Sequence, residues 1–357
     1  MSVRVKKRLT ADLKLIRECL IDFQPLSIIL YGGYGRGEGS WVWYNNENCV
    51  PYNDYDILMI LEKKIPEEII KSIRKKLAQD IGIRWVDIGQ KTPKELKKLR
   101  PSIYNYDLKY ASKVIYGNGQ IKNLIPEIDS TKIPLKDGEI LFFTRLWTLL
   151  GSLDKKGFNV SRKGEDARFF RNQMAKSILA IVDVVLLQKG LYHSSYKERV
   201  KRLKGYFEHK KELIELAVWA LSEKLKPTSL EMASEEITAL YDKIYYQYFK
   251  EMYHVLSKYY NRNIENARDL EIIINWGFIN LLNRIGWLLL KRNFQMEKQI
   301  SMNIAQLYIA TSYNYGETND VYLKKGINSL KKINKTIPTN LNWDDARCMA
   351  AEMRLVG

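Results

Sequence analysis

A short apolar segment that begins with two aspartates most constrains how this chain folds. Residues 54–61, DYDILMIL, carry Asp54 and Asp56 at the start and only apolar side chains from Ile57 onward. A strand that is apolar on both faces is buried on both, so this segment is predicted to lie inside a sheet. Alternate residues of a strand share one face, which places both carboxylates on the same side, with Cα atoms roughly 6.5–7 Å apart.

Two other apolar segments are predicted to join the same sheet. Residues 27–31, SIILY, indicate a short buried strand that Gly32 and Gly33 end at once. Residues 83–89, IRWVDIG, indicate a third strand with Asp87 inside it. A carboxylate in such an apolar strand requires a partner, because burying an uncompensated charge is costly.

Helical patterns lie between these strands. Thr10 is a suitable N-cap for a first helix, and Pro66 opens a second helix. The apolar faces of these helices are predicted to be Leu13, Ile16, Leu20 and Ile21 in the first, and Ile69, Ile70, Ile73 and Leu77 in the second. A short helix after Pro93 and a strand or extended segment at residues 111–119 complete this region.

The pattern changes towards the C-terminus, where long segments have helical period and few strand signals. The sequence therefore predicts an α+β chain in two domains. Residues 1–120 form a small mixed β-sheet with flanking helices, residues 121–137 are a linker, and residues 138–357 form an all-helical bundle. Residues 272–290 are strongly apolar but contain Asn and Arg, so we expect a buried helix there and no membrane span.

Composition narrows the possible chemistry. The three cysteines and three histidines have no metal-binding spacing, so a metal in this protein has to be held by carboxylates. The few scattered cysteines and the basic N-terminus without an apolar core predict a cytoplasmic protein. The net charge of +17 is spread along the chain. It favours anionic ligands in general, although a solvated, lysine-rich surface explains it equally well.

A glycine-rich segment and the aspartates together suggest phosphate chemistry. In residues 31–41, YGGYGRGEGSW, the glycines let the backbone turn sharply and approach a ligand, and Arg36 adds a charge suited to phosphate. The spacing of Asp54 and Asp56 suits two Mg²⁺ ions roughly 3.5–4 Å apart, as in phosphoryl transfer. Asp87 is a candidate general base or further metal ligand. Alternatively, the Asp-x-Asp pair is simply a strand end in water.

This order of elements resembles the DNA polymerase beta-like nucleotidyltransferase superfamily. The resemblance rests on strand, Gly-Gly, helix, strand with Asp-x-Asp, helix and strand with a third Asp, and it covers residues 10–120. The wording GGYGRGE is close to that of uridylyl- and adenylyltransferases. SKVIYG, at residues 112–117, is similar to the end of the core domain in minimal and aminoglycoside nucleotidyltransferase-like proteins.

The resemblance implies a role for each of these residues. Gly32 and Gly33 would hold the β- and γ-phosphates of a nucleoside triphosphate, with ATP the expected one. Two Mg²⁺ ions, or Mn²⁺ in their place, would be bound by Asp54, Asp56 and Asp87, the last of which could instead act as base. Arg36 and Glu38 would contribute to nucleotide binding. The chain departs from the family in the long segment 34–53, which is expected to be either a lid or a longer surface loop.

The sequence thus predicts a Mg²⁺-dependent nucleotidyltransferase that moves a nucleoside monophosphate to a hydroxyl of a small molecule or a protein. The helical domain is expected to shape the acceptor site. Nucleic acid is not favoured as a partner, because a basic run at residues 197–204 is more often a solvated helix face. Two alternatives stay open: an enzyme that extends RNA or makes oligonucleotides, and an inactive nucleotide-binding or interaction module. The sequence leaves the acceptor and the oligomeric state open.

Overall fold

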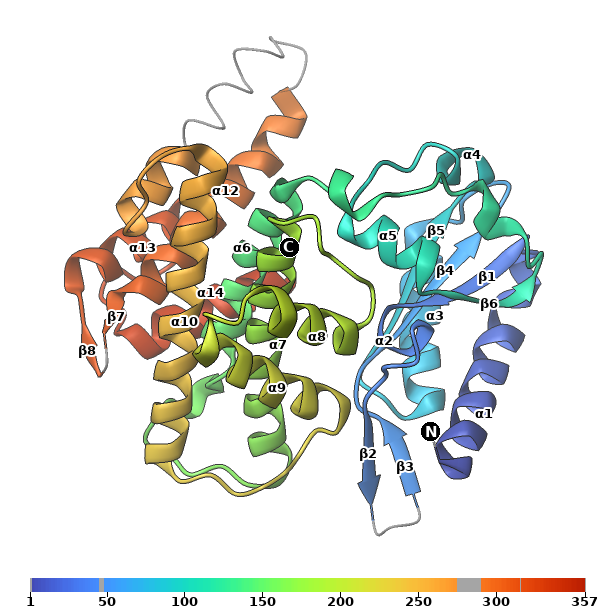
Figure 1. The fold of residues 1–357 in the computed structure, drawn as a ribbon, viewed down its shortest axis with the longest axis horizontal. Coiled ribbons are helices and arrows are strands. Elements are labelled where there is room, and N and C mark those ends of the chain that lie inside the picture. Colours follow the sequence, from blue (N-terminus) through green and yellow to red (C-terminus); the bar gives the residue numbers. More distant parts are fainter. Residues whose placement is uncertain (1, 45–47, 275–289, 315, 357) are drawn as a thin grey trace. The chain divides into compact units, whose positions relative to one another are not determined.

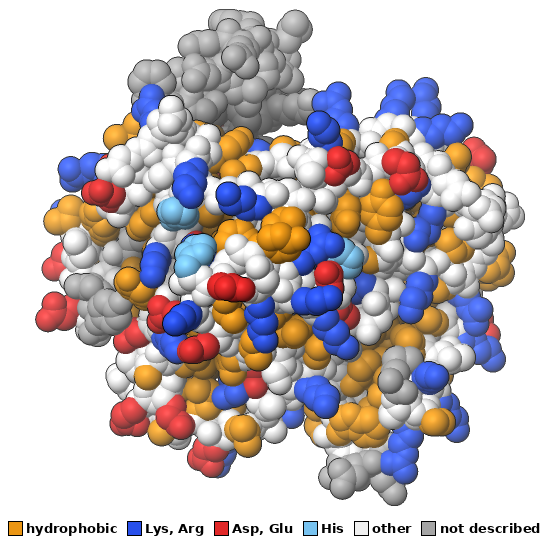
Figure 2. Space-filling view, in the orientation of Figure 1, with side chains coloured by type: hydrophobic (Ala, Val, Ile, Leu, Met, Phe, Trp, Pro, Cys, Tyr) orange, Lys and Arg blue, Asp and Glu red, His pale blue; other side chains and the backbone are white. Residues whose placement is uncertain are grey.

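The chain is an α+β protein, which confirms the fold class predicted from the sequence (Figure 1). The structure, a computed structural model, describes residues 2–44, 48–274, 290–314 and 316–356. On the face shown in Figure 2, lysine and arginine side chains are scattered among other side chains and do not gather in one patch. The net charge of +17 therefore does not by itself mark a binding surface on that face.

The described residues form two compact units. The first contains residues 1–137 and 186–227, and the second contains residues 138–185 and 228–357. This grouping differs from the boundaries expected from the sequence, which left 186–227 with the helical residues. The reason is packing, because Leu187 and Tyr192 belong to a buried cluster of the first unit.

A four-stranded mixed sheet organises the first unit, in the order β5-β4-β1-β6. Its strands are β1 (Ser27–Tyr31), β4 (Tyr55–Ile60), β5 (Val86–Lys91) and β6 (Lys113–Gly117). Strand β4 pairs with β5 in parallel and with β1 antiparallel, and β1 pairs with β6 antiparallel. The doubly apolar strand β4 is thus inside the sheet, as predicted from its sequence.

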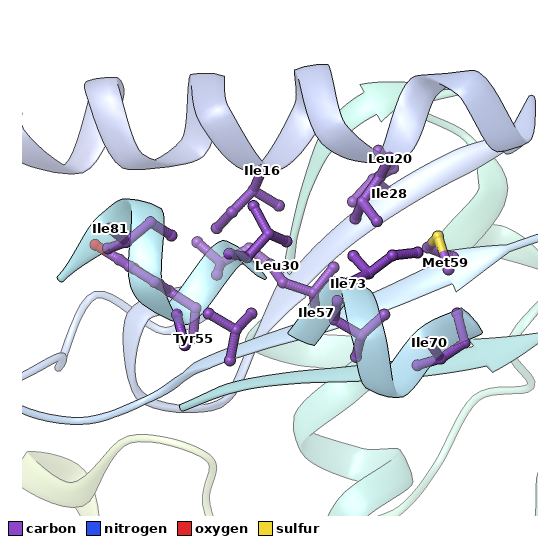
Figure 3. Packing of buried hydrophobic residues seen from close by; sticks show 14 of the residues in the cluster. Ile16, Leu20, Ile28, Leu30, Tyr55, Ile57, Met59, Ile70, Ile73 and Ile81 are labelled. Carbon is purple, nitrogen blue, oxygen red and sulfur yellow. The ribbon is translucent and has the colours of Figure 1, made fainter. Parts of the chain in front are cut away.

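Helices α1 (Val3–Leu20) and α3 (Glu67–Ile81) supply the apolar side chains that cover one face of this sheet. In Figure 3, Ile16 and Leu20 of α1 point towards Ile28 and Leu30 of β1. All four side chains are at most 1% exposed. The same cluster continues through alternate residues of β4 to the buried face of α3.

The opposite face of the sheet is covered by α4 (Pro93–Leu96), α5 (Ile103–Tyr110) and the segment that follows β6. Side chains of β1 and β4 that point away from α1 and α3, including Ile29 and Leu58, pack against Leu96 and Leu108. Both faces of the inner strands are therefore buried by apolar packing. Short 3-10 turns lie at Ile21–Phe23, Ile121–Leu124 and Ser130–Lys132.

Four details of the sequence prediction were wrong. Ile21, expected on the apolar face of the first helix, follows the end of that helix and is 41% exposed. Helix α1 begins at Val3 with Ser2 as its N-cap, so Thr10 lies inside the helix, whose apolar pattern extends back to the buried Val5. Ile69 is 42% exposed, because the buried face of α3 starts at Ile70. The third strand begins at Val86, later than expected, since the residues just before it are exposed.

The first unit also contains α8 (Tyr196–Tyr206) and α9 (Lys211–Leu225), which contact each other. The carboxylate of Glu38 fixes the start of α8: it accepts hydrogen bonds from Ser195 Oγ at 2.7 Å and from the Tyr196 amide at 2.8 Å. Residues 186–227 are therefore joined to the glycine-rich segment by a buried cap.

The second unit is mainly helical. It contains most of α6 (Leu135–Gly151) and α7 (Gly164–Leu187), and all of α10 (Ser234–Tyr260), α12 (Leu290–Ser312), α13 (Asp320–Ile333) and α14 (Trp343–Val356). A 3-10 turn, Asp154–Lys156, and a small hairpin of β7 (Tyr313–Asn314) and β8 (Glu317–Thr318) complete it. Most of the apolar window 272–290, predicted as a buried helix, lies outside the described residues.

A buried polar network should contribute measurably to the stability of the first unit. Asp12 is 2% exposed and accepts hydrogen bonds of 2.8 Å from the Tyr55 hydroxyl and from Arg8 Nε. We expect Tyr55→Phe to lower the free energy of unfolding by about 1–3 kcal/mol, since it leaves a buried carboxylate oxygen without its donor. Urea denaturation measures this change. Tyr44→Phe, at a residue 49% exposed, is the control, and equal effects of the two changes would contradict the expectation.

Candidate functional site

The glycine-rich turn after β1 is pressed directly against a carboxylate. Strand β1 ends at Tyr31, and Gly32 begins the short helix α2 (Gly32–Gly35) with a φ of +61°. A Cβ atom built on Gly32 would lie 1.8 Å from Asp56 Oδ2. Only glycine fits there, because any side chain would overlap the carboxylate. The turn therefore presents its backbone beside Asp56.

The strand register brings the predicted carboxylates together. Asp56 of β4 is paired with Asp87 of β5 and, on its other side, with Tyr31 of β1. Residues paired across neighbouring strands point to the same face of the sheet. Asp54 precedes Asp56 by two residues and belongs to the same face. The structure thus gathers Gly32 and the three aspartates at one end of β4 and β5.

Crowding of these charges changes the acidity of the central carboxyl group. Burial, followed by the charges of Asp54 and Asp87, raises the pKa of Asp56 to about 7, against an ordinary value of 3.8. Arg36 and Lys224 partly oppose this increase. Burial also raises the pKa of Asp87, while the neighbouring Arg74 lowers it. A cation bound among these groups would relieve their repulsion.

The donor set suits a hard divalent cation, because carboxylate oxygens are the ligands that Mg²⁺ prefers. The residues that could hold such an ion are Asp54, Asp56 and Asp87. Within the described ranges, however, no three His, Cys, Asp or Glu side chains already stand in a metal-binding arrangement. The fit of a cation consequently rests on the chemistry of the crowded carboxylates. It also rests on the absence of a side chain at Gly32, which lets the backbone lie against Asp56.

Arg36 and Glu38, expected to contact a nucleotide, make contacts within the protein. Arg36 Nη1 donates a hydrogen bond of 3.0 Å to Asp107 Oδ2, and its guanidinium lies 4.5 Å from the centre of the Tyr196 ring. Glu38 is 6% exposed and caps α8. The geometry therefore gives both side chains a role in joining α2, α5 and α8. Arg36 still acts on Asp56 through its charge.

Two basic residues near the aspartates were not found by reading the sequence. Lys224 of α9 is 7% exposed and its ammonium donates a hydrogen bond of 2.9 Å to Asn53, next to Asp54. Arg74 of α3 has its Nε 3.9 Å from Asp87 Oδ1. The sequence carried no signal for Lys224, which lies far along the chain, and the basic end of α3 was interpreted only as a response to the helix dipole.

Two tyrosines also border the carboxylates. The rings of Tyr31 and Tyr104 meet edge to face, with centroids 5.4 Å apart. Burial is the main cause that raises the pKa of both hydroxyls, and the charges of Asp56 and Asp87 raise them further. Since Tyr104 is 40% exposed, its ring is available to a ligand at the same face.

Segment 34–53, which the sequence left open as a lid or a surface loop, contains a β-hairpin. Strand β2 (Trp41–Tyr44) pairs antiparallel with β3 (Asn48–Pro51). Trp41 packs edge to face against the buried Tyr34, with centroids 5.5 Å apart, whereas Trp43 and Tyr44 are exposed. One aromatic side chain of the segment thus anchors the hairpin to the domain, and two remain accessible.

No protein-family model matches this chain, and no curated protein sequence matches it either. In the described ranges, none of the helices is both long enough and apolar enough to cross a bilayer.

The contact between Gly32 and Asp56 can be tested with a matched pair of glycines. Gly32 and Gly37 both have positive φ, at +61° and +78°, but a Cβ on Gly37 would meet nothing within 4 Å. Gly37→Ala should cost only backbone strain, about 1–3 kcal/mol. We expect Gly32→Ala to cost clearly more in urea denaturation, because it also displaces the Asp56 carboxylate. Equal losses would show that the close approach has no energetic consequence.

The raised pKa of Asp56 predicts a specific pH dependence of stability. Its folded pKa is about 7 against an ordinary 3.8, so the folded state holds this proton more tightly than the unfolded state does. Ionised Asp56 thus lowers the free energy of unfolding increasingly as the pH rises between these values. In metal-free buffer, the melting temperature of Asp56→Asn should exceed that of the parent by an amount that grows up to about pH 7 and then stays constant.

The exposed Asp80 provides the control for this experiment, since Asp80→Asn removes a carboxylate from α3 without touching the sheet. The increase towards pH 7 is expected for Asp56→Asn, and Asp80→Asn serves as the reference for the loss of one carboxylate outside the site. A pH-independent difference for Asp56→Asn would contradict the crowding of charge at the site.

Proposed function

We propose that the chain is a Mg²⁺-dependent nucleotidyltransferase with the polymerase beta-like fold, in which Asp54, Asp56 and Asp87 form the metal-binding carboxylates. The observation that carries this proposal is the close approach of Gly32 to Asp56 at the end of β4. It places a side-chain-free backbone turn beside a crowded set of oxygen ligands. Phosphate groups and the cations that accompany them require both features at one place.

The order of the elements supports the proposal. The chain runs from β1 through the glycine turn to β4, then through α3 to β5, and the sheet order places β4 between β1 and β5. The order of these elements along the chain is the one on which the sequence resemblance rests. A nucleoside triphosphate, with ATP as the expected one, would lay its β- and γ-phosphates along the Gly32-Gly33 backbone.

In the proposed reaction, an acceptor hydroxyl oxygen bonds to the α-phosphorus of the triphosphate while the bond from that phosphorus to the β-phosphate oxygen breaks. Pyrophosphate leaves, and the hydroxyl proton passes to a carboxylate. Asp87 suits this base role because burial raises its pKa and thus its affinity for a proton. Bound Mg²⁺, or Mn²⁺ in its place, would supply charge neutralisation for the phosphates.

The neighbouring residues have supporting tasks. Lys224 lies close enough to lower the pKa of Asp56, so its ammonium helps to keep that carboxyl ionised for metal binding near neutral pH. Arg74 has the same effect on Asp87. Tyr104, exposed and beside Asp56 and Asp87, offers a ring for the nucleotide base or the acceptor.

A small molecule or a protein side chain is the acceptor class that we favour. The dispersion of Lys and Arg on the face in Figure 2 offers no continuous track for a polyanion there. The run on α8 at residues 197–204 alternates exposed lysines with the buried Arg199, Val200 and Leu203, so it is partly a packing face. We expect the reaction to take place in the cytoplasm.

Transfer of label from each α-labelled triphosphate tests the function. The protein is incubated with Mg²⁺ and each nucleotide, with and without cell extract, and the products are separated into small molecules, protein and nucleic acid. We expect label in one of the first two. Asp54→Asn, Asp56→Asn and Asp87→Asn should each reduce transfer at least about 100-fold, while Asp80→Asn leaves it unchanged.

Other outcomes decide between the alternatives. Label in RNA or in oligonucleotides would favour an enzyme that extends nucleic acid. Saturable binding of a triphosphate without transfer under any condition would favour an inactive binding module. The absence of both binding and transfer would refute the proposal.

A further inference from the structure

A hollow of about 690 Å³ lies within the second unit, and its lining residues do not include those of the proposed transfer site. Its walls come from α10, from the chain at the end of α12 and in the β7–β8 hairpin, from the start of α13 and from residues 265–267. Figure 1 shows α13 beside α12 with the hairpin leading from one to the other. This volume is in the range of small-molecule sites, about 300–1,000 Å³.

Aromatic rings make up much of the wall. Tyr245, Phe249 and Tyr253 follow one another at intervals of four residues along α10, so they lie on one side of the helix. Their successive ring centroids are 4.8 Å and 5.7 Å apart. Tyr313 stands edge to face with Tyr245 at 5.6 Å, and Tyr322 adds a ring from α13. The hollow is therefore lined by packed rings rather than by mobile aliphatic side chains.

The charged side chains of the wall are mainly acidic. Glu265 and Glu317 both line the hollow and are both exposed, against one lysine, Lys250. The chain as a whole carries a net charge of +17, so an excess of acidic over basic side chains in this wall is opposite in sign to the charge of the protein. Carboxylates repel phosphates and other anions, so nucleotides fit this hollow poorly.

Lys250, the lysine in the wall, lies over an aromatic ring. The ammonium of Lys250 lies 5.4 Å from the centre of the Tyr246 ring, one helical turn before it on α10. A cation within about 6 Å of an aromatic ring is attracted by the negative face of the ring. The ammonium of Lys250 thus already occupies the cation-binding position at the Tyr246 ring, at the edge of the hollow.

We propose that this hollow binds an alkylated ammonium ion, a cation with an apolar outer surface. The ring faces of the α10 tyrosines and Tyr322 would contact its alkyl groups, and Glu265 and Glu317 would supply the counter-charge. A fully alkylated ammonium has no N–H group that requires a hydrogen-bond acceptor, and it gains from both charge and apolar contact. The site is separate from nucleotidyl transfer and does not depend on it.

Choline and its neutral isostere 3,3-dimethyl-1-butanol test the proposal on the full-length protein, because they differ only in the charge of the central atom. Isothermal titration calorimetry measures both. We expect saturable choline binding, with the isostere about 5-fold to 30-fold weaker, the ratio that a cation–π contact produces. The double variant Glu265→Gln/Glu317→Gln should weaken choline binding severalfold and leave the isostere unchanged.

Lys250→Gln gives a prediction of opposite sign. It removes the internal ammonium from the Tyr246 ring, so choline should bind more tightly, not less. Glu208→Gln, an exposed glutamate of the first unit, is the control and should have no effect. Absence of saturable choline binding, equal binding of the isostere, or weaker binding by Lys250→Gln would each overturn the proposal. None of these results bears on whether the aspartate site transfers nucleotides.

Discussion

Burial of Asp56 beside two further carboxylates, at one end of β4 and β5, is the constraint on which the first unit depends. The register of the strands pairs Asp56 with Asp87, and Gly32 lies directly against the Asp56 carboxylate. Raising the pKa of Asp56 from 3.8 to about 7 corresponds to roughly 4 kcal/mol of destabilisation of its ionised form. The apolar packing on the two faces of the sheet offsets this cost.

The cations near this site come from different parts of the chain: Arg36 follows the glycine turn, and Lys224 belongs to α9. Arg36 is hydrogen-bonded to Asp107 and Lys224 to Asn53, and the charge of each lowers the pKa of Asp56. Residues 186–227 belong to the first unit. They carry Lys224 and helix α8, whose start is capped by Glu38. The first unit is thus completed by a segment that follows residues 138–185 of the second unit in sequence.

The sequence predicted those features that depend on local pattern. Strands β1, β4 and β6 and helix α3 lie where apolar runs and turn residues placed them, and the shared face of Asp54 and Asp56 follows from strand geometry alone. Asp87 joins them through the register of β4 and β5. Contacts between distant residues left no such pattern: the Glu38 cap joins residues more than 150 positions apart, and Lys224 is farther still from Asn53. The β2–β3 hairpin was missed because β2 has Trp41 and Trp43 on one face and Val42 and Tyr44 on the other, so its sequence shows no alternation of apolar and polar residues.

The arrangement of charge also suggests what a destabilising carboxylate contributes at position 56. A protein that needed only stability could replace Asp56 by a neutral residue, which would remove the repulsion and keep the strand pairing. Arg36 and Lys224 are hydrogen-bonded to other residues, and Asp56 lies against Gly32, which carries no side chain. Negative charge gathered beside such a turn is what a divalent cation and its phosphate ligands would neutralise. The cost in stability and the proposed chemistry therefore have the same structural origin.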